Sequence, residues 1–84
     1  MFYDVALLDT ATRPGGMVST FRGLANNRYE AETECVNRAQ SLTEDERKAL
    51  RSRIRARQHN WRECDPSLVA RYQFVVEMRP TQPV

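Results

Sequence analysis

Three stretches of the chain carry apolar side chains with the two-residue period of a β-strand. Residues 2–8 and 17–24 are short apolar runs, and residues 71–79 alternate most clearly between apolar and polar positions. The apolar face of this last stretch consists of Tyr72, Phe74, Val76 and Met78. A strand of this kind packs on a core with one face and meets water with the other. The pattern therefore predicts three half-buried strands.

The first two strands are predicted to form a hairpin. Residues 9–16 between them are polar and contain the sequence PGG, which favours a turn. In the second strand, Met17 and Phe21 are expected to share one face. In the first strand, Asp4 lies on the face opposite to Val5, which indicates that this opposite face is at least partly solvated.

A first helix is predicted for residues 28–40, with Asn26 or Asn27 as its N-cap. Small or apolar residues recur in this region at positions i, i+4, i+8 and i+11, which places them on one stripe of a helix. The stripe consists of Ala31, Cys35, Ala39 and Leu42. Because these side chains are small, we expect the helix to lie close to the sheet.

A second helix is predicted for residues 44–59. Thr43 and Glu46 have the spacing of a capping box, and acidic residues precede basic ones, as the helix dipole favours. The narrow apolar seam of this helix consists of Leu50 and Ile54, with Trp61 beneath them if the helix continues that far. We therefore expect this seam to anchor the helix to the sheet.

The order of elements is ββααβ, which predicts an α+β fold: a three-stranded antiparallel sheet with two helices packed on one face. The expected core consists of Val5, Leu7, Phe21, Cys35, Leu50, Ile54, Tyr72, Phe74, Val76 and Met78. The other face of the sheet would be open, and an open sheet with exposed edges invites a partner or a homodimer. We expect residues 1–79 to form one domain and residues 80–84, which contain two prolines, to form a disordered tail.

The composition fits this small domain. The chain has 84 residues, of which 40% are hydrophobic and 29% charged, and its length is near the lower limit for a single core. It contains no run of about 18 apolar residues, so no membrane span is expected. The segment MFYDVALLD has no basic start, so we expect no signal peptide and a cytoplasmic location.

Charge is distributed unevenly along the chain. Residues 1–46 hold four basic and eight acidic residues, a net charge of −4. Residues 47–84 hold nine basic and three acidic residues, a net charge of +6, so the total of +2 conceals a dipolar sequence.

The second helix carries most of the positive charge, with seven basic residues and no acid between Arg47 and Arg62. At 100° per residue, its predicted solvent side contains Lys48, Arg51, Arg55 and His59. Three interpretations stay open: a solvated face or one paired with acids of the first helix, a protein-binding patch, and a nucleic-acid contact. The candidate binding residues are Lys48, Arg51, Arg55, Arg57, Trp61 and Arg62.

Residues that could perform chemistry are few. Cys35 and Cys64 with the single histidine, His59, fall short of a tetrahedral zinc set unless a carboxylate joins them. We expect two free thiols, with Cys35 buried as a small hydrophobic residue. No phosphate-binding loop or nucleophile–base set is recognisable, so we expect no catalytic residues, no metal site and no cofactor.

In size, element order and asymmetric charge, the chain resembles small accessory proteins of phages and other mobile elements, anti-CRISPR proteins among them. The resemblance implies a protein that occupies a surface of a host complex and performs no catalysis. Many anti-CRISPR proteins are acidic mimics of DNA, and the seven basic residues between Arg47 and Arg62 distinguish this chain from them.

Our leading hypothesis is therefore a non-catalytic interaction protein that binds a protein or nucleoprotein complex through the basic helix and blocks it sterically. The alternative is a small nucleic-acid-binding regulator that uses the same helix on phosphates.

Overall fold

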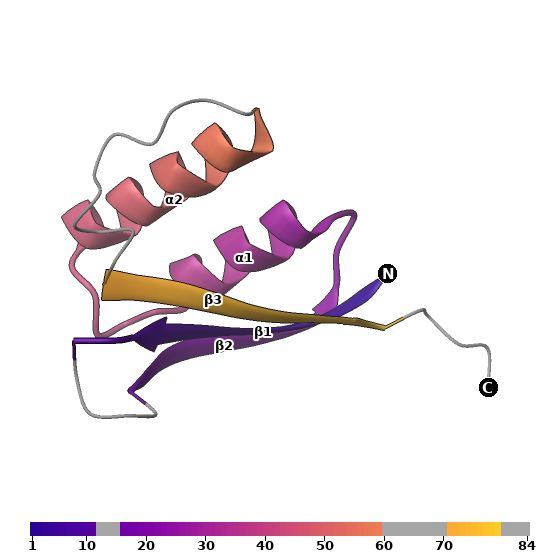
Figure 1. The fold of residues 1–84 in the computed structure, drawn as a ribbon, viewed down its shortest axis with the longest axis horizontal. Coiled ribbons are helices and arrows are strands. Elements are labelled where there is room, and N and C mark those ends of the chain that lie inside the picture. The colour runs from indigo at the N-terminus through magenta and orange to yellow at the C-terminus, as the bar shows by residue number, and fades with distance from the viewer. Residues whose placement is uncertain (12–15, 60–70, 80–84) are drawn as a thin grey trace.

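The structure is a computed structural model that describes residues 1–11, 16–59 and 71–79 of the chain. Its five elements follow the predicted ββααβ order (Figure 1). They are β1 (Phe2–Asp9), β2 (Met17–Leu24), α1 (Arg28–Asn37), α2 (Glu44–Gln58) and β3 (Tyr72–Arg79). Each strand agrees with its predicted bounds to within one residue at either end. The predicted tail, residues 80–84, lies outside the described residues.

β1 is the central strand of an antiparallel sheet with the order β2-β1-β3, so β2 and β3 form its two edges. Both helices lie on one face of this sheet, and no described element covers the other face (Figure 1). Val5 pairs with Phe21 of β2 and with Val76 of β3. Because paired residues project to the same side, these apolar side chains form a row beneath the helices. The predicted architecture is confirmed.

The pairing of β1 with β2 contains a β-bulge. Leu7 pairs with Ser19 whereas Leu8 pairs with Met17, which leaves Val18 as the extra residue. The bulge moves Met17 to the open side of the sheet, where it is 61% exposed. The expectation that Met17 shares a face with Phe21 was therefore wrong, because simple alternation does not anticipate the extra residue.

α1 begins at its predicted N-cap. The side chain of Asn27 accepts a hydrogen bond from the backbone N–H of Glu30 at 2.9 Å. The helix ends at Asn37, three residues before its predicted end, because the chain tightens into shorter turns. The N–H of Ala39 bonds to the carbonyl of Val36, three residues back, instead of continuing the four-residue pattern.

α2 begins with the predicted capping box. The N–H of Thr43 donates to the Glu46 carboxylate at 2.9 Å, and the N–H of Glu46 donates to the Thr43 hydroxyl at 3.1 Å. The helix ends at Gln58, with His59 as its C-cap. Three acids in its first turn and two arginines in its last complement the helix dipole.

The core lies between the sheet and the helices, and α1 forms most of its upper wall. The predicted stripe of α1 is buried along its whole length, and Val36, which the stripe omits, is buried with it. Seven of the ten predicted core residues are buried: Val5, Leu7, Phe21, Cys35, Leu50, Ile54 and Tyr72. Phe74 and Val76 are partly buried and pack against this cluster.

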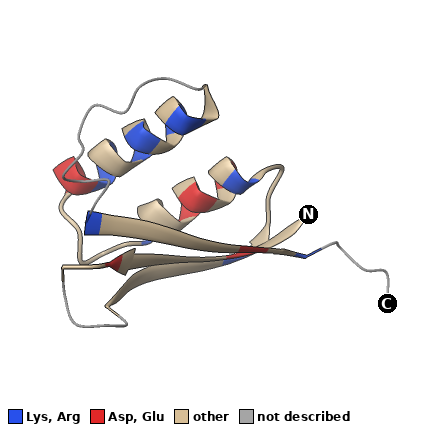
Figure 2. Cartoon of the chain, viewed as in Figure 1, with Lys and Arg blue, Asp and Glu red and all other residues tan. Residues whose placement is uncertain are grey.

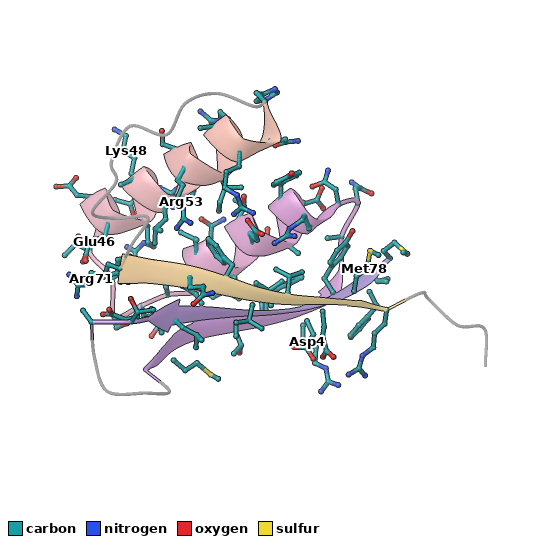
Figure 3. All side chains as sticks on the ribbon, in the orientation of Figure 1. Asp4, Glu46, Lys48, Arg53, Arg71 and Met78 are labelled. Atoms are coloured by element: carbon teal, nitrogen blue, oxygen red, sulfur yellow. The ribbon has the colours of Figure 1, made fainter. Side chains whose placement is uncertain are left out.

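Met78 is the predicted core residue that the structure places elsewhere, since it is 56% exposed. α1 packs mainly on β1 and β2, and α2 packs on α1. The last residues of β3, at the edge of the sheet, therefore have little helix above them. Strand alternation correctly places Met78 on the helix side of the sheet (Figure 3), but alternation cannot say how far the helices reach.

Cys35 joins α1 to β2 in the centre of the core. The Ser19 hydroxyl donates to the backbone carbonyl of Cys35 at 2.8 Å, and the Cys35 thiol donates to the carbonyl of Ser19 at 3.4 Å. Burial raises the pKa of this thiol, so it stays protonated. Cys35 is a free, buried cysteine as predicted, and Cys64 lies outside the described residues.

Candidate binding surfaces

The basic residues of α2 point in two directions, although the sequence groups them in a single run. Figure 2 shows them along α2 after its acidic first turn, and Figure 3 shows Lys48 pointing away from the sheet and Arg53 pointing toward it. We call Arg47, Arg51, Arg53 and Arg57 the inward arginines because each bonds to another element or to the α1–α2 connection. The outward basic residues are Lys48 and Arg55, which are exposed.

Arg47 closes the connection between the two helices. Its Nη1 donates to the backbone carbonyls of Ala39 at 2.9 Å and Leu42 at 2.8 Å. Carbonyls beyond a helix end lack a helical partner. The guanidinium donates to both, and the Ala39 carbonyl accepts from the N–H of Leu42 as well. Its other nitrogens bond to the carboxylate of Glu44, which holds the side chain in place.

Arg51 bridges the two helices instead of facing solvent as predicted. Its Nη2 donates to Glu44 at 2.7 Å, and its Nη1 donates to the side-chain oxygen of Asn37, the last residue of α1, at 3.0 Å. Hydrogen bonds from Arg51 and then from Arg47 lower the pKa of Glu44, so this carboxylate is ionised at neutral pH. The side chain of Arg51 is only 28% exposed, since α1 covers part of it.

Arg57 pairs with a buried carboxylate that the sequence patterns did not reveal. The side chain of Glu32 is 0% exposed, and its two oxygens accept from Arg57 at 3.1 Å and from Arg28 at 3.0 Å. The guanidinium of Arg57 also lies over the ring of Tyr29, 6.0 Å from its centroid. A buried charge must be paired, so Glu32 ties the end of α2 to the start of α1.

Arg53 ties α2 to the sheet. Its Nη1 donates to the backbone carbonyl of Tyr72, the first residue of β3, at 3.0 Å. Together the four inward arginines connect α2 to α1, to the α1–α2 connection and to β3. They therefore hold the helix in place, and the apolar seam of Leu50 and Ile54 is only part of its anchorage.

The side chains of Lys48 and Arg55 make no hydrogen bond or ion pair with another residue of the described part of the chain. They lie seven residues apart, about 10 Å along the axis of α2, with the exposed Ser52 between them. We call these two residues and Ser52 the outer face of α2. His59 is exposed near its end. Trp61 and Arg62, the other predicted binding residues, lie outside the described residues, as does the predicted packing of Trp61 under the helix.

The second exposed surface is the face of the sheet opposite to the helices, which we call the open face. Figure 3 shows Asp4 projecting from it. The register places twelve side chains there in four rows across β2, β1 and β3. The rows are Met17–Leu8–Gln73, Thr20–Ala6–Val75, Arg22–Asp4–Glu77 and Leu24–Phe2–Arg79.

The open face combines exposed apolar side chains with charged ones. Met17, Leu24 and Val75 are 61%, 66% and 48% exposed. The charged row contains a cation on β2 and two carboxylates on β1 and β3. Asp4 pairs with Arg22 at 3.5 Å, and Glu77 pairs with Arg79 at 3.5 Å. This face is therefore neither a core surface nor a uniformly polar one.

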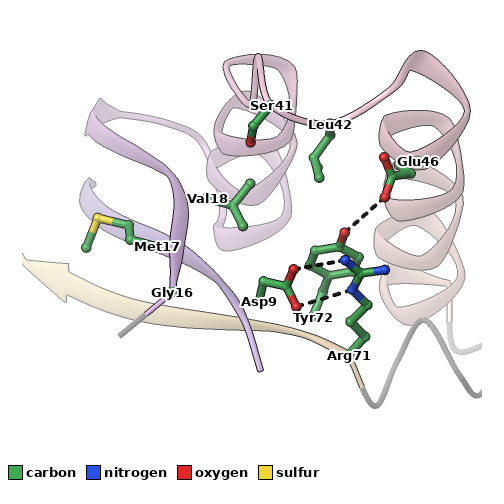
Figure 4. Close-up of a pocket in the computed structure, with 9 residues that line it drawn as sticks. All are labelled: Asp9, Gly16, Met17, Val18, Ser41, Leu42, Glu46, Arg71 and Tyr72. Carbon is green, nitrogen blue, oxygen red and sulfur yellow. Dashed lines mark hydrogen bonds and ion pairs between the residues drawn. The ribbon is translucent and has the colours of Figure 1, made fainter. Parts of the chain in front are cut away.

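A pocket of about 340 Å³ lies where β1 ends and β3 and α2 begin (Figure 4). Its polar wall is a chain of bonded side chains. Arg71 donates two hydrogen bonds to Asp9, at 3.1 and 3.2 Å, and stacks on the ring of Tyr72. The hydroxyl of Tyr72 donates to Glu46 at 3.0 Å. Val18 and Leu42 form part of the apolar side.

These bonds determine the charges in the pocket. Hydrogen bonds from Arg71 lower the pKa of Asp9. The backbone N–H of Thr43 and then the Tyr72 hydroxyl lower the pKa of Glu46. Burial, followed by the bond to Glu46, raises the pKa of Tyr72. Both carboxylates are therefore ionised at neutral pH with internal partners. No buried side-chain nitrogen or oxygen in the described part of the chain lacks a hydrogen bond. We therefore interpret the polar residues of the pocket wall as contacts that hold β1, β3 and α2 together.

No family model, curated protein or solved structure matches this chain. Among the described residues, no group of three or more His, Cys, Asp or Glu side chains could hold a metal ion. Within the same ranges, no helix is long and apolar enough to cross a membrane. The features from which a function can be inferred are thus the two exposed surfaces.

Proposed function

We propose that this chain is a non-catalytic interaction protein that binds a protein or nucleoprotein complex and blocks it sterically, in the manner of an anti-CRISPR inhibitor. The observation that carries the proposal is the outer face of α2. Lys48 and Arg55 project from a helix whose other arginines are engaged internally, so two unengaged cations stand on a rigid support.

Rigidity favours binding because little side-chain and backbone freedom is lost when the partner docks. The capping box and the inward arginines hold α2 at both ends. The spacing of about 10 Å between Lys48 and Arg55 suits two carboxylates on an acidic protein surface. Electrostatic attraction of this kind mainly accelerates and orients the encounter. The free, buried thiol of Cys35 suits a reducing compartment, and we place the protein in the cytoplasm.

The alternative is that the same two cations contact nucleic-acid phosphates. Two contacts predict that the logarithm of the binding constant falls with the logarithm of salt concentration with a slope of about 2. A mobility-shift assay with mixed DNA and RNA separates the alternatives. Absence of a shift at about 50 mM salt contradicts nucleic-acid binding and leaves the protein partner.

The decisive test is affinity capture from the native host with a matched pair of variants. Lys48→Glu/Arg55→Glu reverses the outer face, and Glu30→Lys/Glu34→Lys changes as much charge on the exposed side of α1. We expect the first variant to lose the protein captured by the wild type and the second to retain it. Retention by both variants, with each folded by circular dichroism, would exclude the outer face of α2 as the contact surface.

A further inference from the structure

The charged row of the open face places two carboxylates next to each other. Asp4 lies directly across from Glu77 in the register of β1 and β3. Like charges in this position repel each other. Arg22 on β2 pairs with Asp4 at 3.5 Å. Because β1 lies between β2 and β3, Arg22 is not a direct neighbour of Glu77 in this row. Within one copy the cation beside Glu77 is Arg79, two residues along the same strand, in an exposed ion pair at 3.5 Å. A cation placed above Glu77 by a second sheet would add a further partner to this row.

We propose that the open face is the interface of a symmetric homodimer, in which two sheets pack face to face. The twofold axis runs parallel to β1 and above it. Such an axis keeps each residue at the same height along the strands but exchanges the two edges. β2 of one copy therefore lies across from β3 of the other, and Arg22 lies across from Glu77 of the second copy. Symmetry provides this ion pair twice.

The remaining rows are compatible with the same axis. Leu8, Ala6 and Phe2 of β1 meet their own counterparts, which covers the apolar centre of the face. Thr20 lies across from Val75 of the second copy. Asp4 also meets its own counterpart. The doubled row holds two arginines and four carboxylates, and the Arg79 beside each Glu77 supplies the other two positive charges.

Dimensions indicate a weak dimer. Eight residues at about 3.3 Å each and three strands about 4.8 Å apart give a footprint of roughly 26 by 14 Å. This footprint, roughly 360 Å² per copy, is about half of what a standard stable interface buries, so we expect a dissociation constant in the upper micromolar range, about 100 µM. The helices lie on the opposite side of each sheet (Figure 1), so the dimer leaves both outer faces of α2 accessible.

The inference does not depend on the proposed function, because the two use opposite sides of the molecule. It also differs from docking of an unrelated basic protein on the open face. Such a partner could neutralise Glu77 equally well, but it would not produce self-association of the purified chain.

The test is sedimentation velocity of the purified chain from about 1 to 500 µM, a range that brackets micromolar affinity. In the proposed dimer, Arg22→Glu places a carboxylate across from Glu77 of the second copy. Glu77→Arg places a cation across from Arg22 of the second copy. We expect each variant alone to dimerise at least about tenfold more weakly than the wild type. An equimolar mixture of the two should form a heterodimer, because each new charge then meets its opposite.

Two further variants keep the result interpretable. Val75→Ser removes exposed apolar area without changing charge and should also weaken the dimer, which covers the case in which a charge variant fails to fold. Lys48→Glu lies on the other side of the molecule and should leave the dimer unchanged. A wild type that stays monomeric at about 500 µM overturns the proposal, and so does a mixture that associates no better than the separate variants.

Discussion

The inward and outward basic residues of α2 share a sequence run but have different environments. Arg57 bonds to the buried carboxylate of Glu32. The side chain of Arg55, two residues earlier, is exposed and makes no hydrogen bond or ion pair with another described residue. Likewise Arg47 closes the α1–α2 connection while its neighbour Lys48 points away from the sheet (Figure 3). A basic run on a helix is therefore not by itself a binding surface, because a long guanidinium can equally well connect elements.

The same comparison explains the charge asymmetry of the sequence. The acidic first half supplies Glu32 and Asp9, and the basic second half supplies Arg57 and Arg71, which bind these carboxylates across 25 and 62 positions of the chain. Much of the dipolar character is therefore neutralised within the fold. On α2, the cations that these contacts leave exposed are Lys48 and Arg55.

The largest expected effect comes from the buried carboxylate. Glu32→Gln removes the charge that two arginines surround, and we expect a loss of about 3 kcal/mol in the free energy of unfolding. Urea denaturation measures it. Glu34→Gln, on the exposed side of the same helix, is the matched control and should change stability by less than about 0.5 kcal/mol. Equal losses in the two variants would show that Glu32 is not engaged as described.

A smaller loss is expected for Arg47→Met, which removes the guanidinium donor from the carbonyls of Ala39 and Leu42, although the N–H of Leu42 still donates to the Ala39 carbonyl. Two such bonds correspond to about 1–2 kcal/mol in the free energy of unfolding, since carbonyls that lose a donor near a helix end can recover some hydration. The control is Lys48→Met, which removes the positive charge of the next residue. The Lys48 side chain does not bond to these carbonyls, so this variant should change stability little. A similar loss from both variants would contradict the division into inward and outward residues.

Acid should destabilise the protein through the carboxylates whose pKa is lowered on folding. Asp9 and Glu46 have folded-state pKa values below their ordinary values of 3.8 and 4.5. Their stabilising contribution is therefore complete above these ordinary values and is lost as pH falls through the lower folded ones. The urea midpoint should fall from about pH 5 downward.

The control for this pH dependence is Glu46→Gln, whose amide oxygen can still accept from the Thr43 N–H in the capping box while its amide nitrogen donates to the Tyr72 hydroxyl. Because it does not titrate, this variant should lose less stability than the wild type between about pH 5 and pH 3. An identical slope in the two proteins would mean that Glu46 contributes nothing to the acid transition.

The smallest stability effect is expected for the outer face of α2. Lys48→Glu and Arg55→Glu should each shift the free energy of unfolding by less than about 0.5 kcal/mol, because exposed charges contribute little. Arg51→Glu should lower the urea midpoint more than Arg55→Glu, since it places a carboxylate beside Glu44 and Asn37. The reverse order would mean that Arg51 faces solvent, as the helical wheel alone predicted.

Local patterns predicted the elements well because their causes are local. The alternation of β3, the N-cap at Asn27 and the capping box of Thr43 and Glu46 depend on residues a few positions apart. Local patterns did not predict the bulge at Val18, because it adds an unpaired residue to β2. They did not predict the exposure of Met78 either, because it depends on how far the helices extend over the sheet.

The candidate surface could be predicted only in part. A helical wheel identifies Lys48 and Arg55 as solvent-facing, and the structure agrees. It also grouped Arg51 with them, because a wheel does not include the neighbouring helix. The spacing of Arg28 and Glu32 suggests a local ion pair, but no local signal brings Arg57 to the same carboxylate. That contact depends on how α2 packs against α1.

The most direct test of the division within α2 is the stability of two matched substitutions, Arg57→Met and Arg55→Met. Both remove one positive charge near the end of the same helix and keep a long side chain. Urea denaturation should show a loss of about 2 kcal/mol for Arg57→Met, which weakens the pairing of Glu32, and almost none for Arg55→Met. Equal free energies of unfolding for the two variants would contradict the account.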